Sequence, residues 1–330
     1  MAYFGAINLL GTSMLWPWLA PPLLLGASIW IYNFFEGERL LRDLWYESYL
    51  AGADIVALDR AWAARTDHSH VIISLTTIPS RIDLIGDTLK SLLLQTHPPR
   101  EVRLNLPAFS QRERCGYEIP AWLQQLAAVR LIRCEDYGPA TKLIPTLASS
   151  DTDQPILVVD DDRIYAPTLI ADLEMAAAAR PGTALGLGGW IAPPDLIDRP
   201  TTILSNLMQR PPAPIRSARI RRAVAVDILQ GMAGYLVQPR FFDFKILTDY
   251  SDAPPAARLV DDVWISGHCQ AEKFVIPANP NFPPKRHISR HKRSSLGWIN
   301  RGPGAPENRN NSIMLKYFAH VWKVGGNYHA

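Results

Sequence analysis

Residues 156–165 form an apolar run that leads directly into three carboxylates: Ile156-Leu157-Val158-Val159-Asp160-Asp161-Asp162-Arg163-Ile164-Tyr165. The first four side chains are apolar and three of them are β-branched, which is typical of a short buried strand. A buried strand cannot hold three charged groups in its interior. We therefore expect the acidic triplet, Asp160, Asp161 and Asp162, to lie at the end of the strand, where the chain emerges.

The acidic triplet indicates a bound cation. Carboxylates packed this closely repel one another and raise one another's pKa unless a cation neutralises them. Mg2+ or Mn2+, hard ions that prefer oxygen ligands, is the natural counter-ion, and such an ion keeps open positions for the phosphates of a nucleotide diphosphate. The alternative is an acidic turn that caps a helix beginning near Pro167, but a cap needs only one Asp.

The flanking segments predict the fold class. Residues 71–75, 101–106 and 129–133 have the pattern of strands, and residues 82–95 have apolar positions at helical spacing. Alternating strands and helices imply an α/β fold with a mainly parallel sheet between helical layers. Ligands on such sheets bind outside the carboxyl ends of the strands. Thr76, Thr77 and Arg81 follow the first strand, so we expect them beside the acidic triplet.

A second candidate for phosphate binding is Gly138-Pro139-Ala140-Thr141-Lys142. The glycine allows an abrupt turn, the proline suits a helix start, and a lysine in the first turn suits an anion. The alternative is a plain turn before a helix, with an exposed lysine.

Further along the chain we predict a helix over 168–179, a strand over 184–190 and a last helix over 312–324. Residues 193–222, rich in Pro and Arg, lack periodicity and are interpreted as a long loop, either a lid or a binding loop. Gly231 and Gly234 would let a ligand approach the backbone closely. Asp261 and Asp262 precede an apolar helical run, so they either cap a helix or supply a general base.

Residues 1–35 carry no charged side chain, and 9–35 are long enough to cross a bilayer, although Pro17, Pro21 and Pro22 complicate a single straight helix. Arg39 and Arg42 follow this segment, which favours a cytoplasmic position for the rest of the chain. We divide the chain into a membrane-anchoring segment (1–35), an amphipathic connector (36–69) that lies on the membrane or packs on the catalytic domain, a catalytic domain (70–283) and a basic tail with a helix (284–330).

The overall charge is nearly balanced, with 34 basic and 31 acidic residues, so we expect no nucleic-acid partner. Three scattered cysteines without CxxC spacing favour reduced thiols. Two basic stretches, 210–222 and 285–293, would contact phosphates or an anionic membrane, or else are solvated loops. Within the second, His287 is a candidate metal ligand, with a solvated histidine as the alternative.

The ordered set of segments resembles a metal-dependent glycosyltransferase of the GT-A fold, family 2-like, over roughly residues 70–280. The segments that carry the resemblance are 74–81, 138–142, 159–162 and 261–264. The resemblance implies a nucleotide-diphospho-sugar donor and Mn2+ or Mg2+. It places Thr76 and Arg81 near the nucleoside, Thr77, Lys142 and Asp161 near the donor, and Gly231 and Gly234 along the donor-sugar and acceptor pocket. Asp160 and Asp162 would form the DxD pair, with Asp162 as the direct metal ligand, and Asp261 or Asp262 would be the catalytic base of an inverting enzyme.

We therefore expect a membrane-anchored glycosyltransferase that acts on a glycan or lipid-linked acceptor, on the cytoplasmic face of a bacterial inner membrane. The sequence leaves its oligomeric state open. A sugar-phosphate nucleotidyltransferase is the first alternative, although the segment 76–81 has no glycine to form a phosphate loop. The second is a non-catalytic, membrane-anchored protein that binds a glycan or a nucleotide.

Overall fold

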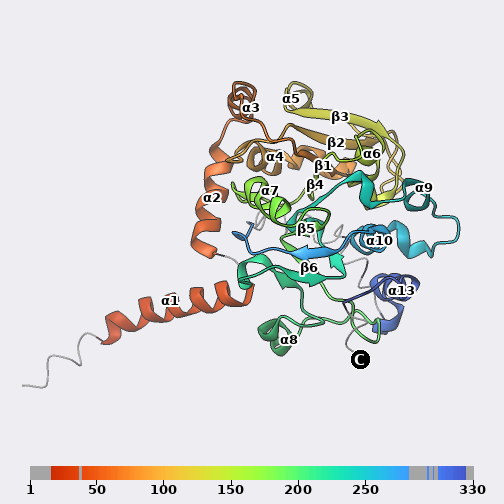
Figure 1. Cartoon of the computed structure of the whole chain (residues 1–330). Coiled ribbons are helices and arrows are strands. Elements are labelled where there is room, and N and C mark those ends of the chain that lie inside the picture. Colours follow the sequence, from red (N-terminus) through yellow and green to blue (C-terminus); the bar gives the residue numbers. More distant parts are fainter. Residues whose placement is uncertain (1–15, 37–38, 282–295, 297–299, 301–303, 325–330) are drawn as a thin grey trace, which may run out of the picture.

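The computed structural model describes residues 16–36, 39–281, 296, 300 and 304–324. At its centre is an eight-stranded sheet in the order β3-β2-β1-β4-β10-β5-β11-β8 (Figure 1). Only β10 and β8 run against the direction of the others, so the predicted mainly parallel sheet is confirmed. The strands of this sheet are β1 (Ile72–Thr76), β2 (Glu101–Pro107), β3 (Val129–Cys134), β4 (Ile156–Val158), β5 (Ala184–Gly186), β8 (Val224–Val226), β10 (Tyr235–Val237) and β11 (Lys273–Val275).

Helices cover both faces of the sheet because the buried strands present apolar side chains on both sides. One hydrophobic core joins β1, β2 and β4 to α4 (Gly86–Leu93) and α7 (Leu169–Ala179). The other core contains side chains of α6 (Ile144–Ala148), α10 (Asp261–His268) and α13 (Asn310–Tyr317). Two short helices each add a buried leucine to these cores: α5 (Ala121–Gln124) adds Leu123 to the first, and α9 (Phe244–Leu247) adds Leu247 to the second. The helix over 82–95 is therefore shorter than predicted, since a 3-10 turn, Pro79–Leu84, precedes α4.

The predicted single strand over 184–190 is wrong, because the chain changes sheets within it. Its second half is β6 (Gly188–Trp190), which lies between β7 (Ile215–Arg216) and β9 (Ile228–Leu229) in a separate three-stranded sheet. Gly189 permits this second pairing, since a Cβ there would lie 2.7 Å from the Ile228 carbonyl oxygen.

The predicted long loop over 193–222 is also wrong in part, because it contains β7 and the helix α8 (Ile203–Met208). Thr202 and Ser205 form a reciprocal capping box that begins α8. The sequence did not predict this short helix because the segment is rich in Pro and Arg. The Thr-x-x-Ser spacing is the local pattern that indicates it. The last helix, α13, is likewise shorter than predicted and belongs to one of the two main cores.

The N-terminal part of the described chain consists of α1 (Trp16–Glu36), α2 (Leu40–Gly52) and α3 (Ile55–Ala63). Figure 1 shows α1 extending away from the body of the molecule. Among the described residues, only the segment Trp18–Glu36 is long and apolar enough to cross a membrane, and none of it is buried. By contrast, α2 and α3 pack on α4, with Tyr46 and Leu50 buried, so this segment contacts the part of the chain that forms the main sheet and its helices.

Candidate active site

The parallel pairing of β1 with β4 brings the ends of both strands to one edge of the sheet. Asp161 is held there by side chains that follow β1. The Thr77 hydroxyl donates to its Oδ2 at 2.6 Å, and an Arg81 guanidinium nitrogen donates to its Oδ1 at 3.1 Å. The hydroxyl of Thr88 donates to the Asp161 carbonyl at 2.8 Å. The structure thus brings Thr77, Arg81 and the acidic triplet together at this edge.

The three carboxylates of the triplet have different surroundings. The side chain of Asp161 is 10 % exposed, whereas those of Asp160 and Asp162 are 30 % and 37 % exposed. Burial raises the pKa of Asp161 to about 6; Arg81 opposes this and Asp162 adds to it. Asp161 therefore anchors the turn, whereas Asp160 and Asp162 remain partly exposed.

Lys142 lies among carboxylates from two other elements. It ends the 3-10 helix Gly138–Lys142, which begins at Gly138 with φ +63°, where a Cβ would lie 2.4 Å from the Arg258 carbonyl oxygen. The Lys142 ammonium is 2.8 Å from Asp160 Oδ1, 2.5 Å from Asp261 Oδ2 and 3.4 Å from Asp262 Oδ1. The pKa of Lys142 lies well above its usual value because these carboxylates outweigh its burial. The alternative of an exposed lysine is wrong, since its side chain is 5 % exposed.

Asp261 and Asp262 begin α10 and differ in orientation. Asp261 is 12 % exposed and pairs with Lys142, whereas Asp262 is 28 % exposed and accepts a hydrogen bond of 3.0 Å from the Gly231 amide. Burial raises the pKa of Asp262 to about 7; Lys142 opposes this, while Asp261 and Asp160 add to it. Neither aspartate is the N-cap residue of the helix, which is Val260.

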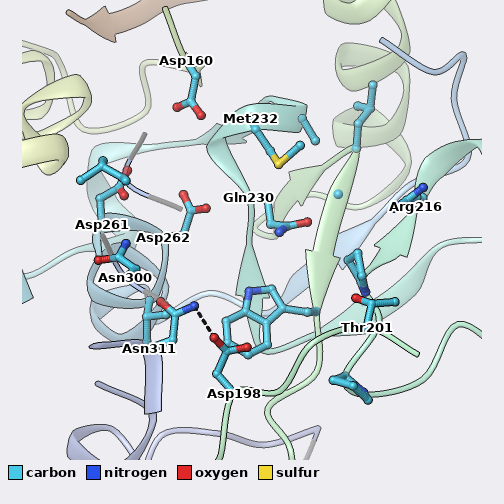
Figure 2. Close-up of a pocket in the computed structure, with 18 of the residues that line it drawn as sticks. Asp160, Asp198, Thr201, Arg216, Gln230, Met232, Asp261, Asp262, Asn300 and Asn311 are labelled. Carbon is cyan, nitrogen blue, oxygen red and sulfur yellow. Dashed lines mark hydrogen bonds between the residues drawn. The ribbon is translucent and has the colours of Figure 1, made fainter. Parts of the chain in front are cut away.

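Two cavities meet at these residues. The first, of about 1240 Å³, contains Thr76, Thr77, Arg81 and the acidic triplet in its wall. The second, of about 610 Å³, extends from Asp160, Asp261 and Asp262 to residues on the opposite wall. Figure 2 shows this second cavity, with Arg216 and Thr201 across from the aspartates and a hydrogen bond of 3.0 Å between Asn311 and Asp198. The described residues that line both cavities, and so lie where the two join, are Lys142, Asp160, Arg163, Met232 and Leu296.

Two of the predicted site residues have other surroundings than expected. Gly231 and Gly234 are not among the described residues that line the two cavities. Gly231 lies behind Lys142, since a Cβ there would be 2.0 Å from the ammonium nitrogen. Gly234 adopts φ +83° beside Leu169 and Leu157, so its role in the structure is a backbone turn. His287 lies outside the described residues.

The sequence did not predict most of the residues that line the two cavities. In the first cavity these residues include Arg112, Tyr117 and Asp136, and in the second they include Asp198, Trp190, Gln230 and Arg216. Tyr117 donates a hydrogen bond of 2.8 Å to the Thr77 carbonyl, which ties the loop after β2 to the site. Of these residues only Arg216 carried a sequence signal, because it falls within the arginine-rich stretch.

The donor set fits a divalent cation that is completed by a ligand. In direct ion pairs, five carboxylates (Asp160, Asp161, Asp162, Asp261 and Asp262) share two cations, Lys142 and Arg81, which leaves an excess of negative charge. The raised pKa values of Asp161 and Asp262 reflect burial and this excess. The described residues contain no preformed group of three His, Cys, Asp or Glu ligands. An ion held by Asp160 and Asp162 would therefore need oxygen ligands from a substrate, as Mg2+ and Mn2+ sites usually do.

No protein-family model matches this chain, and neither does any curated protein sequence. Among solved structures, the chain is similar to a mannosyltransferase of Pyrobaculum calidifontis in complex with GDP-Man and Mn2+, with 16 % identity, a TM-score of 0.44, and coverage of 84 % of this chain and 80 % of that one. GalNAc-T7 with UDP, GalNAc and Mn2+ has 13 % identity and a TM-score of 0.39, over 63 % of this chain and 41 % of that one.

A third similar structure is a Francisella tularensis 2-C-methyl-D-erythritol 4-phosphate cytidylyltransferase, with 12 % identity, a TM-score of 0.38, and coverage of 68 % of this chain and 98 % of that one. The chain itself is a mixed α/β protein with a large, mostly parallel sheet flanked by helices.

Proposed function

We propose that this protein is a membrane-anchored, metal-dependent glycosyltransferase that moves a sugar from a nucleotide-diphospho-sugar to a hydroxyl of a lipid-linked or envelope glycan. The observation that carries the proposal is the junction of two cavities at Asp160 and Lys142, with acidic residues from two separate elements around it. A transferase needs this arrangement, since donor and acceptor must meet at one reacting atom.

The donor belongs in the first cavity. Arg81 lines this cavity, so its guanidinium, which pairs with Asp161 and Asp162, would add positive charge beside the phosphates of the donor. Asp160 and Asp162 would hold Mn2+ or Mg2+, which supplies Lewis-acid stabilisation of the departing nucleoside diphosphate. Thr77 and Arg81 position Asp161, and through it the two exposed carboxylates on either side.

The acceptor belongs in the second cavity, and Asp262 is the general base of the proposed reaction. Its carboxylate faces this cavity in Figure 2, and it is the more exposed of the two aspartates on α10. Asp262 would take the proton of the acceptor hydroxyl as that oxygen attacks the anomeric carbon and the bond to the diphosphate breaks. A single displacement of this kind inverts the anomeric configuration. Lys142 and the Gly231 amide hold the carboxylate in place.

The decisive test is binding of a panel of nucleoside diphosphates with and without Mn2+, measured by calorimetry on the wild type and on Asp162→Ala. We expect one diphosphate to bind tightly in the wild type only when Mn2+ is present, and Asp162→Ala to lose that binding. Asp252→Ala, which removes an exposed carboxylate far along the chain from the triplet, is the matched control and should bind as the wild type does. Metal-independent binding, or none at all, would contradict the proposal.

The role of Asp262 is tested by Asp262→Asn. This variant should retain metal-dependent binding of the diphosphate and lose transfer by about 100-fold or more, the usual effect of removing a general base. Equal losses of binding and transfer would instead make Asp262 a structural residue. Release of pyrophosphate from a nucleoside triphosphate and a sugar phosphate would favour the nucleotidyltransferase alternative. Nucleotide binding without any turnover would favour a binding protein.

A further inference from the structure

Helix α8 has its apolar face on the outside. Ile203, Leu204, Leu207 and Met208 are 73 %, 66 %, 43 % and 52 % exposed. They recur at helical spacing and so form one stripe, while Ser205 is buried on the opposite side. A helix of a soluble domain normally buries such a stripe, so the arrangement requires an apolar partner.

The polar side of α8 binds the end of α1. The Asn206 side-chain amide donates to the Phe35 carbonyl at 3.2 Å, and Arg216 donates to the same oxygen at 3.1 Å and to the Glu36 carbonyl. The Arg219 guanidinium lies over the Phe34 ring, 4.9 Å from its centroid. These contacts fix α8 beside the point where α1 leaves the body of the molecule.

Helix α2 presents a similar outward face near the same point. Leu41, Leu44, Trp45 and Tyr49 are 65 %, 50 %, 66 % and 47 % exposed, on the side opposite the buried Tyr46 and Leu50. In the view of Figure 1, α1 leaves the molecule between α2 and α8, and α1 contacts α2 directly. Two outward apolar faces therefore lie near the end of the helix that could cross a membrane.

The charges around α8 favour an anionic lipid surface. Residues 199–222 contain six arginines and no acidic residue, and Arg210, Arg221 and Arg222 are exposed. Anionic headgroups attract such basic residues when these lie near the membrane surface. Four side chains on a helix of six residues are also too few for a stable protein interface, which typically takes about 20 residues from each partner.

We propose that α8 is a second membrane-contacting element, which inserts its apolar stripe into the same leaflet that α1 enters, with the surrounding arginines on anionic headgroups. The consequence concerns the second cavity, whose wall includes Glu36, Thr201 and Arg216. All three lie next to α8 or α1, so this end of the cavity opens at the membrane surface. That its occupant is the acceptor rests on the proposed transferase function, whereas the membrane contact of α8 rests only on the proposed anchoring by α1.

The test uses the full chain in phosphatidylcholine vesicles, with and without phosphatidylglycerol, and an environment-sensitive fluorophore on a single cysteine. Cys115 and Cys134 are replaced by serine, Cys269 is kept because it is buried and shielded from the label, and the one accessible cysteine is placed by Leu207→Cys in α8 or by Ile246→Cys in α9. Ile246 is the matched control, since it is also apolar and 55 % exposed but lies on another helix. A third protein carries the fluorophore at Thr201→Cys.

We expect the fluorophore at position 207 to shift to shorter wavelength and to lose most of its emission to quenchers on the lipid acyl chains, more so with phosphatidylglycerol. At position 201 only a headgroup quencher should act, and at position 246 neither should. Equal, weak quenching at 207 and 246 would overturn the proposal, as would a blue shift at 207 that appears without vesicles and grows with protein concentration. Nucleoside-diphosphate binding by the same proteins is measured separately, so failure of the transferase proposal would leave this result unaffected.

Discussion

At the scale of single residues, Gly231 determines whether Lys142 can reach the carboxylates. A Cβ at this position would lie 2.0 Å from the lysine ammonium and 2.9 Å from Asp160 Oδ1. We therefore predict that Gly231→Ala displaces Lys142 and weakens metal-dependent binding of the nucleoside diphosphate by about 10-fold or more, in line with the loss of charge-assisted contacts. Calorimetry checks this, with the melting temperature as a measure of folding.

Gly86→Ala is the control for this substitution, because no atom lies within 4 Å of the Cβ it adds. Gly86 begins α4, where alanine is a better helix former, so this variant should bind the diphosphate normally. Unchanged binding in Gly231→Ala would mean that Lys142 takes no part in holding the site.

At the scale of elements, the packing of α10 against α13 makes stability depend on pH through His268. Its ring lies 4.4 Å from that of Trp264 and 5.0 Å from that of Phe318, measured between centroids. Burial lowers the pKa of His268 to about 4, against 6.5 in the unfolded chain. Between these pH values the unfolded chain binds the additional proton, so the free energy of unfolding falls as the pH drops from about 6.5 towards 4.

We predict that His268→Leu removes this part of the pH dependence, which amounts to about 2 kcal/mol after allowance for solvent screening. Urea unfolding of both proteins at a series of pH values measures the difference. The control is His320→Leu, which replaces an exposed histidine in the segment after α13. Its free energy of unfolding should depend on pH as that of the wild type does. If the free energy of unfolding of His268→Leu falls with pH as steeply as that of the wild type, groups other than His268 cause the pH dependence.

At the scale of the whole molecule, α1 and the connector make different contributions to stability. The segment Trp18–Glu36 is not buried, and its C-terminal end is held by Asn206, Arg216 and Arg219. We predict that removal of residues 1–38 lowers the free energy of unfolding by only about 1 to 2 kcal/mol, the worth of these polar contacts, and leaves a single cooperative transition.

Removal of residues 1–66 is the comparison for this truncation, and it should destabilise the protein severely. It exposes the surface that Tyr46 and Leu50 bury, and it removes the Asp59 carboxylate, which accepts from the amides of Ala127 and Ala128 at 2.9 Å each. Circular dichroism during thermal unfolding distinguishes the two truncations. Similar melting curves for both would show that the connector is as dispensable for folding as α1.

The sequence by itself determined the sheet class and the place of the acidic site. Apolar runs with β-branched residues are local signals, and three consecutive carboxylates can lie only where a buried strand ends. The convergence of Thr77, Arg81 and Asp161 followed from the rule that parallel strands end at a common edge. Those parts were predictable because neighbours in sequence carry the physical constraint.

Tertiary structure alone decided how Lys142 is used and what lines the second cavity. The lysine looked like a phosphate ligand from its local sequence, and only the packing of α10 against the 3-10 helix Gly138–Lys142 brings Asp261 and Asp262 to it. For the same reason the sequence did not predict that residues 184–190 divide between two sheets, or that the apolar stripe of α8 faces outward. Each depends on partners distant in sequence, and hydrophobic periodicity reports which residues share a face but not what that face meets.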